Sequence, residues 1–203
     1  RMGVSRIGLL GGSFDPIHCA HIALAHAAHE ALALAEVQLL PAGEPWQRAP
    51  LHASPAHRLA MAALATQDQP GLSVNAIEVN RHGPTYTVDT VMALPRAQAY
   101  VWIMGADQLA NFCSWRAWET IVDRVDLAVA ARPGTPLNVP QPLSDLMLTL
   151  GRTITQVPFT PTPVSGTEIR SRLAVGDPVD DWLDPKVVAY IRQHGLYGAS
   201  ASV

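Results

Sequence analysis

Two histidines three residues apart follow a double glycine near the start of the chain. The segment reads Gly11-Gly12-Ser13-Phe14-Asp15-Pro16-Ile17-His18-Cys19-Ala20-His21 and comes directly after an apolar run. Residues three apart lie on one face of a helix, so His18 and His21 could both donate hydrogen bonds to one group of anionic oxygens. The glycines let backbone amides approach such oxygens, and a helix start adds a partial positive charge. This combination indicates a phosphate site.

Other chemistries remain open for this segment from the residues alone. A histidine pair three apart could be half of a zinc site, but no third and fourth ligand follow at a convincing spacing. Cys19 lies between the histidines, yet nothing nearby marks it as an activated thiolate. The glycines match neither a Walker A loop nor a dinucleotide-binding fingerprint. An ordinary turn into a helix is the simplest alternative.

A second helix start with small residues lies about 150 residues further along the chain. The stretch Val164-Ser165-Gly166-Thr167-Glu168-Ile169-Arg170 fits a capping box formed by Ser165 and Glu168. The hydroxyls of Ser165 and Thr167, with the free amides, could bind triphosphate oxygens, and the guanidinium of Arg170 could reach the same oxygens. The alternative is a plain capping box with a solvated arginine.

Two further stretches could bind a second substrate. Pro84-Thr85-Tyr86-Thr87-Val88-Asp89-Thr90 leads into a helix, and Gly105-Ala106-Asp107 follows an apolar strand, with Trp115 eight residues beyond. A glycine at a strand end leaves room for a nucleotide, and an aspartate there is a natural acceptor for ribose hydroxyls. Trp115 or Trp118 could stack on a pyridinium ring, although periodicity alone favours core or interface packing for either tryptophan.

Composition limits the partners. The chain of 203 residues is 48% hydrophobic and 15% charged, with a formal net charge of −3. This charge gives no general attraction to nucleic acid or to an anionic membrane, so we expect neither as a partner. No apolar stretch approaches the roughly 20 residues of a membrane span, and no signal peptide is recognisable. Two cysteines form no disulfide framework in a chain of this length, and we expect a cytoplasmic protein.

Short apolar runs alternate with amphipathic stretches along the whole chain. Strands are expected at Arg6–Leu10, Val37–Leu40, Leu72–Val79, Ala99–Met104, Leu127–Ala131 and Thr153–Val157. Helices are expected at His18–Leu34, 55–67, Thr87–Leu94, Trp115–Arg124 and Leu143–Leu150, after Ser165 as far as Gly176, and from Asp184-Pro185 to Gly195. The alternation predicts an α/β fold, a Rossmann-like doubly wound parallel sheet with helices on both faces. Without repeats or composition shifts, we expect a single domain over residues 1–203, with an ordered core at about 6–197 and a loose C-terminal tail.

Taken together, the motifs resemble those of the nucleotidyltransferase α/β phosphodiesterase superfamily. Gly-Gly-Ser-Phe-Asp-Pro-x-His is similar to its first signature in nicotinate-nucleotide adenylyltransferases, with Ala20 where that family commonly has glycine. Val164–Arg170 resembles the second signature, Ile-Ser-Ser-Thr-x-Ile-Arg. Pro-x-Tyr-Thr-x-Asp-Thr and Gly-Ala-Asp followed by Trp look like the features that separate these enzymes from pantetheine and glycerol-phosphate relatives. The resemblance extends from about Ile7 to Tyr197.

The resemblance implies adenylyl transfer from ATP to nicotinate mononucleotide. Its implied catalytic residues are His18, His21 and Arg170. The residues implied for ATP are Gly11, Gly12, Ser13, Phe14, Gly105, Asp107, Ser165, Thr167 and Ile169. Those implied for nicotinate mononucleotide are Asp15, Arg48, Tyr86, Thr87, Trp115 and Arg132, with Arg48 standing where relatives often have lysine. We expect Mg²⁺ to arrive on the ATP phosphates, and we expect no metal held by the protein alone.

Alternatives to this function stay open. The acceptor could be nicotinamide mononucleotide or phosphopantetheine, and the chain could instead be a nucleotide-sensing module without turnover. The sequence leaves the oligomeric state open between a monomer and a homo-oligomer. It also leaves open whether the loop from Gly43 to Ser54 closes over substrate.

Overall fold

Six parallel strands form the central sheet of the computed structural model, which describes residues 3–45 and 51–201. Their order is β4-β2-β1-β6-β7-β8. The strands are β1 (Arg6–Gly12), β2 (Glu36–Pro41), β4 (Leu72–Val74), β6 (Ala99–Gly105), β7 (Asp126–Ala131) and β8 (Thr155–Pro158). The chain builds outward from β1 to β4, then returns to the other side of β1 and builds outward again to β8. This confirms the predicted doubly wound sheet and places the reversal of strand order between β1 and β6.

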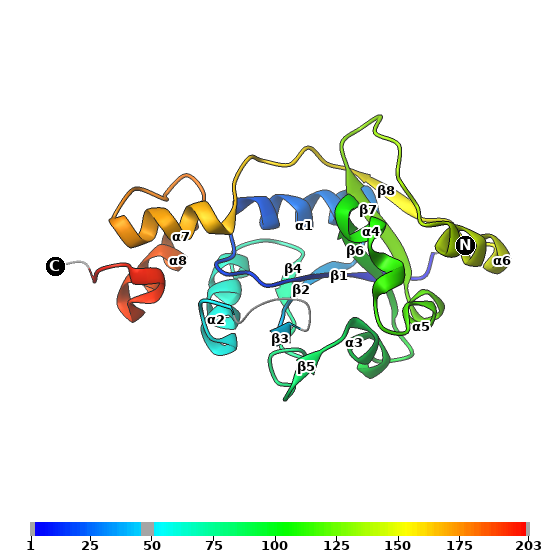
Figure 1. Cartoon of the computed structure of the whole chain (residues 1–203), viewed down its shortest axis with the longest axis horizontal. Coiled ribbons are helices and arrows are strands. Elements are labelled where there is room, and N and C mark those ends of the chain that lie inside the picture. Colours follow the sequence, from blue (N-terminus) through cyan, green and yellow to red (C-terminus); the bar gives the residue numbers. More distant parts are fainter. Residues whose placement is uncertain (1–2, 46–50, 202–203) are drawn as a thin grey trace.

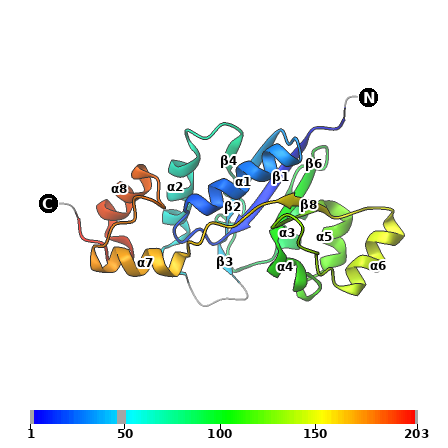
Figure 2. The ribbon, with the colours of Figure 1, turned by 90° about the horizontal axis from the view of Figure 1, so that it is seen from above.

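Helices cover both faces of this sheet. They are α1 (Cys19–Ala31), α2 (Pro55–Thr66), α3 (Thr87–Ala93), α4 (Ala106–Ala110), α5 (Trp118–Arg124), α6 (Gln141–Leu150), α7 (Gly166–Val175) and α8 (Pro185–His194), with short 3₁₀ turns η1 (Phe112–Ser114) and η2 (Leu196–Gly198). Figure 1 shows α1 on one side of the sheet and α3 and α5 on the other. In the view from above, α7 and α8 lie beyond one end of the sheet and α6 beyond the other (Figure 2).

Alternation along β1 divides its side chains between two hydrophobic cores. Leu10 belongs to the core that includes buried residues of α1, α2, α7 and α8, while Leu9 belongs to the core formed with α3, α4, α5 and α6. Successive side chains of a strand point to opposite faces, so an uninterrupted apolar run is what a strand covered on both faces requires. The sheet is therefore packed on both sides at its centre, and its strand ends are held rigidly.

The helix starts follow the predicted caps. The side chains of Ser54, Ser165 and Asp184 accept hydrogen bonds from the backbone amides of the first turns of α2, α7 and α8 at 3.2, 3.1 and 2.8 Å. Glu168 does not complete a capping box with Ser165, because its carboxylate lies 3.4 Å from Arg172 instead. Glycines with positive φ end α7 and α8, as predicted.

Three predicted elements are shorter than expected. The helix predicted over His18–Leu34 spans Cys19–Ala31, with its N-cap at His18 and its C-cap at Leu32. The strand predicted over Leu72–Val79 ends at Val74, because Asn75 bonds Gln38 through its side-chain amide and turns the chain by accepting a bond from the amide of Ile77. The helix predicted from Trp115 begins only at Trp118. A second small sheet, formed by β3 (Glu44–Pro45) and β5 (Pro84–Thr85), was not predicted. Within the part of the chain that the structure describes, no helix has the length and apolar character to cross a bilayer.

Side chains from neighbouring segments pack closely around Gly8, in the middle of β1. A Cβ atom added at Gly8 would lie 2.7 Å from Leu34 Cδ1 and 3.0 Å from Ile103 Cδ1. We therefore expect Gly8→Ala to lower the free energy of unfolding by about 1–3 kcal/mol, measured by urea denaturation. Gly3→Ala is the matched control, because its Cβ would meet no atom within 4 Å. Equal stability of the two variants would contradict this packing.

Candidate active site

A small cavity lies at the carboxyl ends of β1 and β6. Its volume is about 150 Å³, and its lining residues are Gly11, Gly12, Ser13, Ala42, Glu78, Thr85, Thr87, Trp102, Gln108 and Trp115. In open α/β sheets, ligands bind beyond the carboxyl ends of strands at the point where strand order reverses. The cavity therefore lies where the fold favours a binding site, and it contains residues of both the glycine motif and the predicted acceptor motifs.

The segment Gly11–Asp15, called the glycine turn below, begins with the last two residues of β1 and leaves little room for a side chain at either glycine. A Cβ at Gly11 would lie 3.2 Å from the Trp102 ring, and one at Gly12 would lie 3.0 Å from the Phe14 ring. Phe14 is fully buried, has a φ of 48°, and packs its ring edge-on against the ring of His21 with centroids 4.9 Å apart. Because Gly11 and Gly12 carry no side chains, their backbone itself forms this part of the cavity wall.

The histidine pair begins α1. His18 is the N-cap rather than a residue inside the helix, and its backbone amide donates a 3.0 Å hydrogen bond to Nδ1 of His21. The two imidazole rings stack with centroids 3.8 Å apart and an interplanar angle of 27°. The structure thus brings the two predicted histidines together, through a capping contact that their spacing of three residues allows.

Both histidines are neutral at pH 7. Burial lowers the pKa of His18 to about 4, and burial together with the charge of His18 lowers the pKa of His21 to about 3. Nδ1 of His21 accepts a hydrogen bond, so the single proton of its neutral ring lies on Nε2 and can be donated. Nδ1 of His18 is buried and has no hydrogen-bond partner among the described residues. Each ring therefore acts as a neutral donor with one N–H group.

Asp15 connects the glycine turn to three distant segments. Its carboxylate accepts hydrogen bonds from the amides of His52 (2.8 Å) and Ala53 (3.0 Å) and from the hydroxyl of Tyr197 (2.6 Å). Its backbone carbonyl accepts a 2.8 Å bond from Nη1 of Arg170. Asp15 is only 6% exposed, and both carboxylate oxygens are already engaged within the protein. Its polar atoms hold the surrounding segments together.

Arg58 on α2 supports the same turn from below and was missed by sequence reasoning. It is 1% exposed, and its guanidinium donates to the carbonyls of Ala53 (3.1 Å), Ser13 (2.8 Å) and Gly43 (3.1 Å). Burial lowers its pKa, while the nearby charge of Asp15 raises it. Charged side chains are almost never fully buried without partners. A signal for it in the sequence was an arginine within the largely apolar stretch of α2.

The start of α7 lies against the glycine turn. Arg170, besides its bond to Asp15, donates to the hydroxyl of Thr167 at 3.3 Å. A Cβ at Gly166 would lie 3.0 Å from Nη1 of Arg170, so glycine at this position gives the guanidinium room to reach Asp15. Figures 1 and 2 both show the first turn of α7 beside the first turn of α1. The two helix starts predicted to cooperate therefore meet.

The opposite side of the cavity carries the predicted acceptor residues. Thr87 is the first residue of α3 and Trp115 follows η1, and both line the cavity. Trp115 lies outside α5, because its backbone is extended and the N-cap of α5 is Ala117, which has a φ of 48°. The half-buried Tyr86 does not line the cavity, and the guanidinium of Arg116 lies over its ring, 4.7 Å from the centroid.

Glu78 is a second residue that sequence reasoning missed. It lines the cavity and is 6% exposed, and burial raises the pKa of its carboxyl to about 7, partly opposed by Arg81 and Thr90. Beside it, the Thr85 hydroxyl is buried without a hydrogen-bond partner among the described residues. No motif marks an isolated glutamate in a mixed stretch, so this acid could be found only from the fold.

The remaining predicted residues occupy different environments. Ser165, Thr167, Asp107 and Arg132 are exposed, while Gly105 ends β6 and donates its amide to the side chain of Gln108 at 3.3 Å. The side chain of Ile169 is fully buried in the core, where it fixes α7. Arg48 lies outside the described residues.

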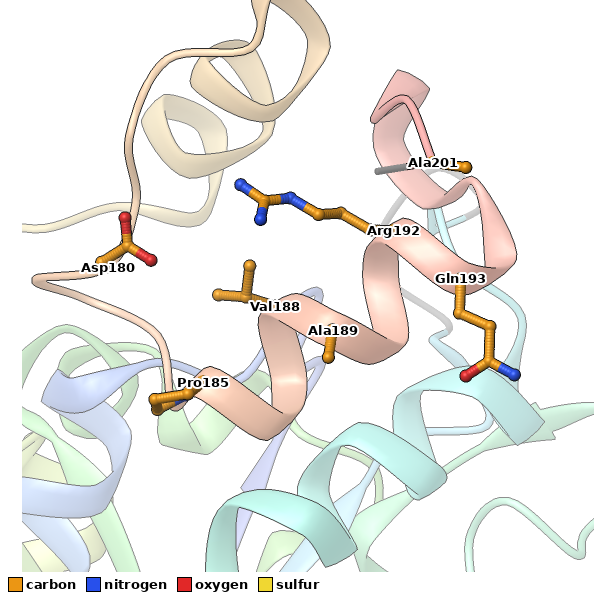
Figure 3. A pocket seen from close by; sticks show the side chains of 7 residues that line it. All are labelled: Asp180, Pro185, Val188, Ala189, Arg192, Gln193 and Ala201. Carbon is orange, nitrogen blue, oxygen red and sulfur yellow. The ribbon is translucent and has the colours of Figure 1, made fainter. Parts of the chain in front are cut away.

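A second cavity lies on the outer side of α8. Its volume is about 430 Å³, and Arg192 and Asp180 approach it from opposite sides (Figure 3). No residue of the motifs described above lines it, so we do not assign substrate to it. Within residues 3–45 and 51–201, no three or more His, Cys, Asp or Glu side chains cluster in a way that could hold a metal ion.

Comparison with known proteins agrees with this geometry. The chain matches the cytidylyltransferase-like family over residues 9–172. It is 57% identical over 194 residues to "Probable nicotinate-nucleotide adenylyltransferase" of Bordetella avium (strain 197N), covering 96% of this chain and 98% of that protein. It is 52% identical over 196 residues to the protein of the same name from Bordetella pertussis (strain Tohama I), covering 97% and 100%.

A solved structure shares the fold. The Plasmodium falciparum nicotinic acid mononucleotide adenylyltransferase complexed with NaAD superposes with a TM-score of 0.72 at 18% sequence identity, covering 98% of this chain and 100% of that one. At this low identity, the match supports the arrangement of strands and helices and nothing finer.

The lowered histidine pKa values predict an acid-sensitive ligand-free state. Unfolded histidines bind a proton below about pH 6.5, whereas folded His21 does so only near pH 3, so the unfolded state gains protons first. The free energy of unfolding should therefore fall as pH decreases from 6.5 toward 4.5. In His21→Gln this fall should be smaller by about 2 kcal/mol, measured by urea denaturation at several pH values. An unchanged pH slope in His21→Gln, with the exposed His82→Gln as control, would be incompatible with a buried neutral ring.

Proposed function

The chain belongs to the cytidylyltransferase-like family and within it to the nicotinate-nucleotide adenylyltransferases, and from this we propose that it transfers the adenylyl group of ATP to nicotinate mononucleotide. The products are nicotinate adenine dinucleotide and pyrophosphate, a step of NAD biosynthesis. The observation that carries the proposal is the 2.8 Å contact between Arg170 and the carbonyl of Asp15, which joins the two helix starts at one site. We place the reaction in the cytoplasm, where ATP is abundant.

We assign the triphosphate to the adjoining starts of α1 and α7, which the bond from Arg170 to Asp15 brings together. His18 and His21 donate from one side, and Arg170 with the hydroxyls of Ser165 and Thr167 donates from the other. The amides of the Gly11–Ser13 turn add donors, while Phe14 and Ile169 hold the two starts in place from the core. Gly105 and Asp107 remain our predicted contacts to the adenosine part of ATP.

We assign the acceptor to the cavity between Thr87 and Trp115. The indole of Trp115 stacks on the pyridinium ring, which combines aromatic contact with cation–π attraction. The amides near Tyr86 and Thr87 bind the carboxylate. Arg132 and Arg48 remain predicted contacts to the acceptor phosphate.

For Asp15 the proposal differs from the sequence prediction of an acceptor contact. Its carboxylate already accepts three hydrogen bonds within the protein, which leaves it little capacity for a ligand. An anionic acceptor would also be repelled by a second negative charge. We therefore propose that Asp15 holds the glycine turn rather than binding nicotinate mononucleotide.

The reaction requires positioning more than acid–base chemistry. A phosphate monoester has a second pKa near 6, so at pH 7 an acceptor oxygen is already a competent nucleophile. It attacks the α-phosphorus of ATP in line, the bond to the bridging oxygen of the β-phosphate breaks, and pyrophosphate leaves with the electron pair. The protein brings two polyanions together and stabilises the charge that grows on the α-phosphate and on the leaving group.

The N–H groups of the proposed site bind phosphate oxygens rather than a cation. A divalent cation would therefore arrive bound to the nucleotide. Because the described residues contain no cluster of ligands able to hold a metal, we propose that Mg²⁺ binds mainly to the ATP phosphates and to water. When bound there, it neutralises charge on the β- and γ-phosphates. The protein's own contribution remains the neutral histidines, Arg170 and the backbone amides.

Glu78 favours nicotinamide mononucleotide as a second candidate acceptor. This buried acid lines the cavity, and in its ionised form it would repel a carboxylate but not an amide. Its pKa of about 7 means that a large fraction of the protein carries it as a neutral acid near neutral pH. A neutral Glu78 would not repel the carboxylate of nicotinate mononucleotide, so nicotinate mononucleotide stays our first choice of acceptor.

Measured specificity separates the two acceptors. With ATP and Mg²⁺, we expect pyrophosphate release with nicotinate mononucleotide at a kcat/KM at least tenfold above that with nicotinamide mononucleotide, a difference of about 1.4 kcal/mol in transition-state binding. A higher value for the amide would reassign the acceptor. No release with either acceptor would favour a nucleotide sensor or the phosphopantetheine alternative.

The histidine pair is tested by substitution. His21→Ala removes a donor aimed at phosphate, and we expect kcat to fall by about 10²–10³-fold with the fold intact. His26→Ala is the matched control, since His26 lies on the same helix but bonds Gln69 outside the proposed site. If His21→Ala retained the turnover of His26→Ala, the role given to His21 would be wrong.

A further inference from the structure

The C-terminal end of the described chain is bonded to the glycine turn. Tyr197 lies in η2, directly after α8, and donates a 2.6 Å hydrogen bond to the carboxylate of Asp15, 182 residues away in sequence. The turn that carries Tyr197 packs against α7, where Gly198 comes close to Ala174. The residue that ends the fold therefore contacts the same aspartate as Arg170.

This hydrogen bond is strong and always available. Burial, and then the bond to Asp15, raise the pKa of the Tyr197 hydroxyl, so the phenol remains a donor across the physiological range. A hydrogen bond to a charged acceptor contributes more than one between neutral groups. Removing the hydroxyl would leave Oδ1 of Asp15 with only the amide of Ala53, in a position that is 6% exposed.

Tyr197 and the residue before Asp15 both have uncommon backbone conformations. Tyr197 has a φ of 57°, and Phe14, the residue before Asp15, has a φ of 48°. Non-glycine residues adopt this left-handed region only when their surroundings fix it. In Tyr197 the conformation directs the phenol toward the turn, and the bond to Asp15 is one contact that stabilises it.

We propose that Tyr197 is a positioning residue for adenylyl transfer, which holds Asp15, and through its carbonyl Arg170, at the triphosphate. Tyr197 touches neither substrate. It acts on the charge-stabilising side of the reaction, because the atoms it fixes belong to the turn and to α7. The acceptor cavity shares Gly11–Ser13 with this turn, whereas Thr87 and Trp115, the contacts proposed for the acceptor, lie in other segments. The inference rests on the function proposed above.

The same contacts couple nucleotide binding to the C-terminal turn. If docking of Tyr197 favours the arrangement that binds triphosphate, then triphosphate binding must favour docking of Tyr197 by the same factor. The coupling requires no large movement, since Tyr197 is joined to the proposed triphosphate site by its one hydrogen bond to Asp15.

Steady-state kinetics of Tyr197→Phe test the positioning role. The substitution removes one hydroxyl, and we expect kcat to fall roughly tenfold with the KM for nicotinate mononucleotide unchanged. Tyr190→Phe is the matched control, because Tyr190 lies on α8 and donates or accepts a 2.8 Å bond with His57 on α2, away from the turn. Its kcat should equal that of the unmodified protein.

The outcomes distinguish the inference from the function beneath it. Unchanged kcat in Tyr197→Phe, or an equal loss in both variants, would overturn the positioning role while leaving the function in place. A rise in acceptor KM together with the loss of kcat would also overturn it, since it would indicate a general loosening of the fold. No pyrophosphate release by the unmodified protein would instead remove the proposed function.

Hydrogen exchange of the full chain gives a second, independent measurement. With a non-hydrolysable ATP analogue and Mg²⁺, we expect slower exchange of the Ala199 amide, which bonds the carbonyl of Leu196 across the turn. Tyr197→Phe should lose this protection, and Tyr190→Phe should keep it. If the analogue binds the unmodified protein without slowing exchange at Ala199, the coupling does not exist.

Discussion

A buried guanidinium is the constraint on which the site depends. Arg58 cannot lose its water unless its N–H groups find acceptors, and it finds them in three backbone carbonyls from separate segments. Its charge is also countered by the nearby Asp15, which binds amides of the segment before α2. Removing Arg58 would take the donor from these three carbonyls, and each buried acceptor left unpaired costs about 1–3 kcal/mol. These bonds fix the backbone conformation of the glycine turn, and the turn in turn positions His18 and His21 at the start of α1.

The site attracts polyanions without a basic protein. The net charge is −3, and burial keeps both histidines neutral at pH 7 in the ligand-free state. Attraction must therefore come from oriented N–H groups, from helix starts and from arginines such as Arg170 and the exposed Arg132. Such donors are fixed before substrate arrives, so little reorganisation accompanies the growth of charge in the transition state.

Local chemistry could be predicted from the sequence, and long-range chemistry could not. The side-chain N-caps of α2, α7 and α8 depend on neighbours within four residues, and the structure has them as predicted. Finer local predictions were wrong, because Gly11 and Gly12 continue β1, His18 is the N-cap of α1, and Glu168 completes no capping box. Arg58 and Tyr197 act through partners in distant segments, and no spacing in the sequence reveals such pairs. The helix expected from Trp115 was wrong at its start, because Ala117 has a φ of 48° and α5 begins only after it, and no short pattern in the sequence marks an alanine for this conformation.

The two proposed substrate sites differ in how they are built. The donor side is formed by bonds between segments far apart in the chain, with Asp15 contacting residues near 53, 170 and 197. The acceptor cavity also draws residues from several segments, Gly11–Ser13 among them, but Thr87 and Trp115 each lie in a short stretch that makes no bond to Asp15 among the described residues. A change in one short stretch can alter the acceptor cavity without disturbing the bonds around Asp15, whereas a change on the donor side disturbs several elements at once. This asymmetry gives a physical reason to expect that the second substrate can change while the bonds around Asp15 stay the same.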